Sequence, residues 1–204
     1  MFGGYDETSC GCFGGCTNEN PCSPVLIDVS GDGFALTDAA NGVNFDVDGN
    51  GSAERRAWTT IGTDDAWLAL DRNRNGIIDG GRELFGSACS QPPPPTGMEL
   101  NGFNALKEYD TAGFGGNNDG FISQQDAIFN QLRLWQDSNH NGVSETNELH
   151  ALNSLGLRKI ELDYRESRKV DEFGNQFKYR AKVKDAQDAQ MGRWAWDVFL
   201  VTEP

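Results

Sequence analysis

Five segments of the chain repeat one pattern of oxygen-bearing side chains. Asp, Asn or Ser stands at alternate positions, a glycine occupies the sixth position, and an apolar or small residue follows. The segments begin at Asp28, Asp46, Asp71, Asp110 and Asp137, and we number them loops one to five. Ca²⁺ takes six to eight oxygen ligands, and loops of this kind supply them from positions 1, 3, 5, 7, 9 and 12, with glycine at position 6 making the sharp turn. The pattern therefore predicts calcium binding.

Loop five has a complete set of predicted ligands. Carboxylates stand at position 9 and at position 12, where a bidentate glutamate is expected. The predicted ligands are Asp137, Asn139, Asn141, the Val143 carbonyl, Glu145 and Glu148.

Loops three and four depart from this spacing. Loop three has Arg82 at position 12, and its carboxylate comes one residue later. In loop four, residues 111–116 separate Asp110 from Asn117, so that either residue is a candidate for the missing ligand. The predicted ligands of loop three are Asp71, Asn73, Asn75, Ile77, Asp79 and Glu83, and those of loop four are Asp110, Asn117, Asp119, Phe121, Ser123 and Asp126.

Loops one and two lack a carboxylate at position 12, where Ala39 and Ala57 stand. Their predicted ligands are Asp28, Ser30, Asp32 and Phe34 in loop one and Asp46, Asp48, Asn50, Ser52 and Glu54 in loop two. The five loops together predict about three to five Ca²⁺ ions. The alternative is that Asp, Asn and Gly form Asx turns, which need no metal.

The charge of the chain favours bound cations. The net charge is −14, and residues 1–157 hold 7 basic against 22 acidic side chains, whereas residues 158–204 hold 10 and 9. Bound cations would offset this repulsion, and the acidity argues against nucleic acid as a partner. No run of about 18 apolar residues is present, so no membrane span is predicted.

Apolar spacing predicts helices around loops four and five. Phe103, Leu106 and Tyr109 recur at helical intervals, as do residues 128, 132 and 135 and residues 149, 152 and 155. Loops four and five lie too close for independent helix–loop–helix units, so a helix over 124–135 is expected to serve both. Segments 121–123 and 143–145 are then expected to pair as a short β-bridge. The prediction for 101–156 is a loop–helix–loop pair of EF-hand type.

Elsewhere the apolar residues alternate, which predicts strands. Short strands are expected at 25–27, 43–45, 56–58 and 66–70, and a C-terminal antiparallel meander over 157–204. The fold class predicted is therefore α+β: short strands with calcium loops, the EF-hand-like pair and the meander. The expected divisions are a Cys/Gly-rich leader (1–23), a β-rich part with three loops (24–100), the helical pair (101–156) and the meander (157–204), with 24–204 forming one domain.

The cysteines suggest an oxidising compartment. Cys10, Cys12, Cys16 and Cys22 cluster in the leader, and Cys89 stands apart. Their spacing favours disulfides over a zinc site, and three pairings of the four are open.

Three stretches resemble the calcium-dependent self-processing module of iron-regulated RTX (repeats-in-toxin) proteins. They are SPVLIDVSGDG at 23–33, LALDRNRNGIID followed by ELFG within 68–86, and LRLWQD followed by NEL within 132–149. The resemblance runs from about Pro24 to Tyr164 and extends to secreted bacterial proteins with EF-hand-like loops. It implies a secreted, extracellular location and folding driven by calcium.

In self-processing members of that family, calcium triggers cleavage of an Asp–Pro bond just ahead of the module. The corresponding bond here is Ser23–Pro24, and the sequence has no Asp–Pro pair. Serine lacks the carboxylate that attacks the bond, so no enzymatic activity is predicted. The predicted function is a calcium-binding extracellular module with a structural or interaction role, whose partner is a protein or a cell surface. The alternatives are calcium-triggered self-processing and a dockerin-like docking module.

Overall fold

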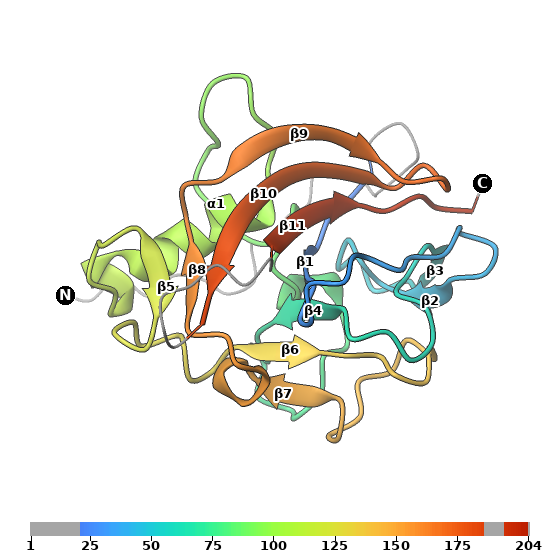
Figure 1. The fold of residues 1–204 in the computed structure, drawn as a ribbon, viewed down its shortest axis with the longest axis horizontal. Coiled ribbons are helices and arrows are strands. Elements are labelled where there is room, and N and C mark those ends of the chain that lie inside the picture. The colour runs from blue at the N-terminus through green and yellow to red at the C-terminus, as the bar shows by residue number, and fades with distance from the viewer. Residues whose placement is uncertain (1–20, 186–193, 204) are drawn as a thin grey trace.

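A computed structural model describes residues 21–185 and 194–203, and its main element is one curled antiparallel sheet (Figure 1). The strand order is β5-β8-β10-β11-β1-β4-β6-β7, with β9 also paired to β10 and a separate β2–β3 hairpin. The strands are β1 (Val25–Ile27), β2 (Val43–Phe45), β3 (Glu54–Arg56), β4 (Ala66–Ala69), β5 (Phe121–Ser123), β6 (Arg133–Trp135), β7 (Leu149–Ala151), β8 (Lys159–Glu161), β9 (Arg165–Val170), β10 (Gln176–Lys184) and β11 (Trp194–Phe199).

Strand β1 lies at the centre of the sheet, between the nearby strand β4 and the strand β11, which is distant in the sequence. It pairs antiparallel with β11, where Leu26 faces Trp196, and with β4, where Leu26 faces Trp67. All three residues of β1 are buried. A strand covered on both faces has a continuous apolar sequence, which explains Val-Leu-Ile at this position.

The sheet separates two hydrophobic cores. The first includes Phe103 and Leu106 of helix α1 (Gly102–Lys107), which begins where the Asn101 side chain accepts a hydrogen bond from the Asn104 amide. The second core contains a cluster of three tryptophans beneath the β2–β3 hairpin. The ring centroids of Trp58 lie 4.6 Å from those of Trp67 and 5.5 Å from those of Trp135.

The predicted EF-hand-like helix pair is wrong. The fold is mostly β, and α1 is the single α-helix among the described residues. Residues 133–135 and 149–151 form strands β6 and β7, and the 3₁₀ segments are η1 (Gly81–Glu83), η2 (Glu108–Asp110), η3 (Ala112–Phe114) and η4 (Leu152–Leu155). β6 lies between β4 and β7 with Leu134 and Trp135 buried, so its apolar residues do not alternate. A strand of this kind mimics helical spacing.

The predicted pairing of 121–123 with 143–145 is also wrong. β5 pairs instead with β8, where Ile122 faces Ile160. In the C-terminal part, β10 pairs antiparallel with β8, β9 and β11, and its side chains alternate between buried Phe177, Tyr179 and Val183 and exposed Lys182.

Part of the N-terminal prediction lies outside the described residues. Cys10, Cys12 and Cys16 belong to this part, so the disulfide arrangement stays a prediction, while Cys22 is buried. No helix among residues 21–185 and 194–203 has the length and apolarity needed to cross a membrane.

Gly86 tests how closely the chain packs beside β1. It forms an isolated bridge with Pro24, and a Cβ at this position would overlap the carbonyl oxygen of Ser23. We expect Gly86→Ala to lower the free energy of unfolding by about 1–3 kcal/mol, the usual cost of overpacking. Urea denaturation measures this, with Gly113→Ala as the control because a Cβ there meets no atom within 4 Å. Equal losses in the two variants would contradict the packing described.

Candidate metal centres

The five loops share one backbone conformation. Position 4 of every loop has a positive φ: Gly31, Gly49, Arg74, Asn118 and His140. Position 6, always glycine, also has a positive φ in each. Arg74, Asn118 and His140 are the three described non-glycine residues with positive φ, a conformation that non-glycine residues adopt with difficulty. The sequence repeat is therefore a structural repeat.

The aspartate at position 1 organises each loop by accepting hydrogen bonds from the backbone. Asp71 accepts from the amides of Asn75 and Gly76 at 3.1 and 2.9 Å, and Asp137 accepts from Asn141 and Gly142 at 3.0 and 2.9 Å. Loop two repeats this arrangement through Asp46. Loop one differs, since Asp28 accepts from Gly31 and Gly33 at 2.6 and 3.0 Å.

Loops two, three and five each connect two paired strand segments. Loop two joins β2 to β3, loop five joins β6 to β7, and loop three returns from β4 so that Leu84 bridges Ala69. Each loop reverses the chain, which brings its flanks together as antiparallel neighbours. Strand segments therefore hold loops two and three, where strands were predicted, and also loop five, where helices were predicted.

Loop five places its carboxylates in a buried setting. Asp137 and Glu148 are each 1 % exposed. The indole of Trp58 donates to Asp137 Oδ2 at 2.9 Å, and the indole of Trp135 donates to Glu148 Oε2 at 3.4 Å. The tryptophan core thus supports the first and the last predicted ligands of this loop directly.

Glu145 gives the test of whether loop five suits a cation. Its Oε1 accepts a hydrogen bond from the side-chain Nδ2 of Asn141 at 2.8 Å, and this hydrogen bond is the main cause of a lowered Glu145 pKa. Its Oε2 is enclosed and meets no hydrogen-bond donor among the described residues. An enclosed carboxylate oxygen without a donor is costly unless a cation neutralises it. The loop-five donors are all oxygens, so the residues present suit Ca²⁺.

In loop three, Glu83 takes the place that Arg82 cannot fill. Glu83 is 4 % exposed, and its carboxylate accepts from the backbone amides of Arg72 at 2.9 Å and Asp79 at 3.0 Å. Burial, with a smaller contribution from the Asp79 charge, raises the pKa of Glu83. The carboxylate one residue beyond position 12 therefore closes the loop.

In loop four, Asp110 and Asn117 both belong to the loop. Asp110 accepts from the amides of Asp119 and Gly120 at 3.1 and 2.9 Å, as position 1 does elsewhere, and Asn117 accepts from Asp119 at 3.2 Å, as position 3 does. The inserted residues fold into η3 and a turn. Asp126 accepts from the Ser123 amide at 2.7 Å at the far end of the loop.

Loop two gathers three carboxylates. Oxygens of Asp46, Asp48 and Glu54 lie within 4.8 Å of one another. Burial raises the pKa of Asp46, and Asp48 raises it further. Asn50 donates to both Asp48 and Glu54, and the Ser52 amide donates to Asn50.

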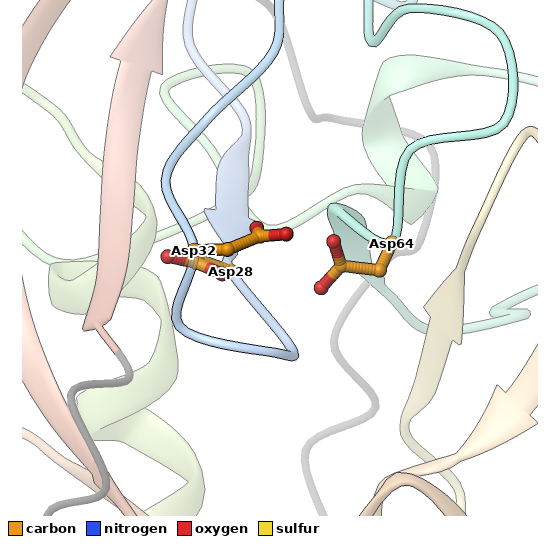
Figure 2. A group of neighbouring side chains, drawn as sticks. All are labelled: Asp28, Asp32 and Asp64. Carbon is orange, nitrogen blue, oxygen red and sulfur yellow. The ribbon is translucent and has the colours of Figure 1, made fainter.

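Loop one contains a residue that the sequence reasoning missed. Oxygens of Asp28, Asp32 and Asp64 lie within 4.8 Å of one another, and Figure 2 shows Asp64 facing the other two from a neighbouring loop. Asp64 Oδ2 also accepts from the Ser30 amide at 2.6 Å. Asp64 thus supplies a carboxylate that the loop lacks at position 12. The loop pattern itself gave no signal for it, because it lies outside the segment.

His140 at position 4 of loop five links this loop to two other segments. Its ring nitrogens lie 2.6 Å from the carbonyl oxygen of Thr59 and 2.8 Å from that of Asn41. Loop five is therefore fixed to the two segments that flank the β2–β3 hairpin.

Comparison with known proteins places these loops in a family. Residues 25–200 match the SPM domain. The chain belongs to the SPM domain family. It is also 35 % identical over 173 residues to the iron-regulated protein FrpA of Neisseria meningitidis serogroup C. This match covers 83 % of the chain but 15 % of FrpA, so the chain spans a small part of this relative. The resemblance to iron-regulated proteins is confirmed.

The Ser23–Pro24 bond lies at the start of the SPM domain, in a buried polar setting. Ser23 is 2 % exposed, and the Ser87 amide donates to its hydroxyl at 3.1 Å. Asp197 of β11 is also fully buried, and its Oδ1 accepts a hydrogen bond from the Gly102 amide at 3.0 Å. Burial raises the pKa of Asp197 from 3.8 to about 7.

The raised pKa of Asp197 predicts how stability depends on pH. The folded protein keeps this proton up to about pH 7, whereas the unfolded chain releases it near pH 4, so stability falls as pH rises across that interval. We expect Asp197→Asn to flatten this fall by about 1 kcal/mol per pH unit. Urea denaturation at pH 4.5 to 7.5 and one fixed calcium concentration measures it. The exposed Asp163→Asn should leave the slope unchanged, and an unaltered slope in Asp197→Asn would contradict the prediction.

Proposed function

We propose that this SPM domain binds Ca²⁺ in its loops and that the ions drive its folding into a structural or interaction module. The observation that carries the proposal is the carboxylate pair of loop five. Glu148 is buried, and the enclosed oxygen of Glu145 meets no donor among the described residues. A divalent cation held between these groups would satisfy both.

Other loops support the same chemistry, but their predicted ligands depart from the complete spacing of loop five. Loop three has the closing carboxylate of Glu83, and loops one and two each gather three carboxylates. Loop one depends on Asp64 from a separate segment. We expect its ion to bind more weakly than that of loop five, because the two segments have to be brought together first.

The energetics make binding part of folding. The chain has a net charge of −14, and the loops bring carboxylates within a few ångströms of one another. One site held at 100 times its dissociation constant contributes about 2.7 kcal/mol, a large share of the stability of a domain. We therefore expect an incompletely ordered chain without Ca²⁺ and a rigid one with it.

The setting that we propose is extracellular. Loops with incomplete ligand sets bind Ca²⁺ in the range of about 10⁻⁴ to 10⁻³ M, which extracellular calcium can fill. Kinship with iron-regulated FrpA is consistent with a secreted, RTX-related protein whose partner is a protein or a cell surface. A dockerin-like role has less support, because strand hairpins hold three of the loops and dockerins are usually helical.

Removing the closing glutamate of loop five tests the proposal. In wild-type protein, Ca²⁺ should raise the melting temperature and chelator should lower it. Glu148→Gln should abolish the tightest binding event and remove about 2–3 kcal/mol of the stabilisation at saturating Ca²⁺. Isothermal titration calorimetry and thermal melts measure these effects, and Glu172→Gln, an exposed residue outside the loops, is the control.

Identical melting curves with Ca²⁺ and with chelator would refute the proposal. Asp28→Ala should weaken only a looser site. Losses from Asp28→Ala as large as those from Glu148→Gln would contradict the ranking of the loops.

We also expect that Ca²⁺ does not trigger self-cleavage here. Serine at position 23 provides no carboxylate next to Pro24, so the chain should keep its full length. Denaturing gels and intact-mass spectrometry after incubation with Ca²⁺ measure this. A fragment that begins at Pro24 would show that the domain processes itself by another route.

A further inference from the structure

Loops three and five touch through one side chain. The hydroxyl of Ser144 accepts a hydrogen bond from the Ile78 amide at 2.6 Å and donates to the Ile78 carbonyl at 3.2 Å. Ser144 and Ile78 are 3 % and 2 % exposed. Each residue stands at position 8 of its loop, 66 residues apart in the chain.

Position 8 is directly connected to a predicted calcium ligand. The carbonyl of Ile77 and the amide of Ile78 belong to the same planar peptide group, so their orientations are fixed relative to each other. If Ca²⁺ holds the Ile77 carbonyl, it also sets the direction in which the Ile78 amide meets Ser144. In loop five the Val143 carbonyl shares its peptide group with the Ser144 backbone amide, so an ion on that carbonyl would position the backbone that carries the Ser144 hydroxyl.

We propose that loops three and five bind Ca²⁺ as a coupled pair and that the Ser144 hydroxyl carries the coupling between them. This inference rests on the proposed function. An ion in one loop fixes one peptide group, which positions Ser144 and Ile78 and pre-orders the other loop for its own ion. Positive cooperativity arises when the first ion orders both loops, because the second ion then binds without the loss of conformational entropy that ordering its own loop would require.

Loop four provides an internal comparison. Its position 8 is Ile122, which pairs with Ile160 of β8 and not with another calcium loop. Loop four therefore contributes to the general stability of the fold, but it is outside the coupled pair.

The experiment is a Ca²⁺ titration of the whole chain followed by two-dimensional NMR. The amides of Gly76 and Gly142 donate to Asp71 and Asp137, so each reports on one loop, and the Trp58 indole is a second reporter for loop five. Glu83→Gln weakens loop three, and Asp126→Asn weakens loop four as the matched control. Each of these two variants is made both in the wild-type background and in the Ser144→Ala background. Because Ser154 is exposed, Ser154→Ala is the control for the loss of a serine hydroxyl.

The expected result is a change at loop five caused by a variant in loop three. Glu83→Gln should raise the Ca²⁺ midpoint at Gly142 at least about fivefold more than Asp126→Asn does, in line with typical coupling between sites. By reciprocity, Glu148→Gln should shift the Gly76 midpoint by a similar factor. In the Ser144→Ala background, Glu83→Gln and Asp126→Asn should raise the Ca²⁺ midpoint at Gly142 equally, so the ratio of the two shifts should fall to about one.

Different failures have different meanings. If neither glycine amide responds to Ca²⁺, the proposed function itself fails. If both respond but Glu83→Gln and Asp126→Asn shift the Gly142 midpoint equally, calcium binding stands and the coupling is overturned. If Glu83→Gln still shifts the Gly142 midpoint more than Asp126→Asn by the full factor in the Ser144→Ala background, the role of the Ser144 hydroxyl is overturned. Should Ser144→Ala not fold, the comparison of Glu83→Gln with Asp126→Asn in the presence of Ser144 still decides whether the pair is coupled.

Discussion

The rest of the structure depends on the aspartate that begins each loop. Its two carboxylate oxygens accept backbone amides, and in loops two to five these are the amides of positions five and six. These bonds curl the backbone and turn the side chains at positions 1, 3 and 5 towards a common centre. The turn that these bonds shape brings oxygen-bearing side chains close together, which is the geometry that we propose for Ca²⁺ binding.

Strands, not helices, connect these loops to the rest of the fold. Loops two, three and five each reverse the chain between paired segments, and the tryptophan core lies beneath them. The indoles of Trp58 and Trp135 reach carboxylates of loop five. The hydrophobic core therefore positions acidic groups of loop five, and the loops connect the paired segments that enclose this core.

The sequence predicted the local parts well and the long-range parts poorly. Loop positions follow from short spacing, so the sequence predicted Glu83, one residue late, as the closing group of loop three, and its carboxylate accepts the Asp79 amide of that loop. Asp64 was missed because it reaches loop one from a different segment, and only the folded chain brings the two together. The helices around loop five were wrong because β6 is buried between two strands, and Leu132 and Trp135 match helical spacing by coincidence.

The central place of β1 has a consequence for biosynthesis. Its two neighbours are β4, made soon afterwards, and β11, the last described strand of the SPM domain. Nearly the whole SPM domain has to leave the ribosome before β1 can pair with its second neighbour. Contacts of such high sequence separation slow folding, so the pairing of β1 with β11 has to wait until the rest of the domain has been synthesised.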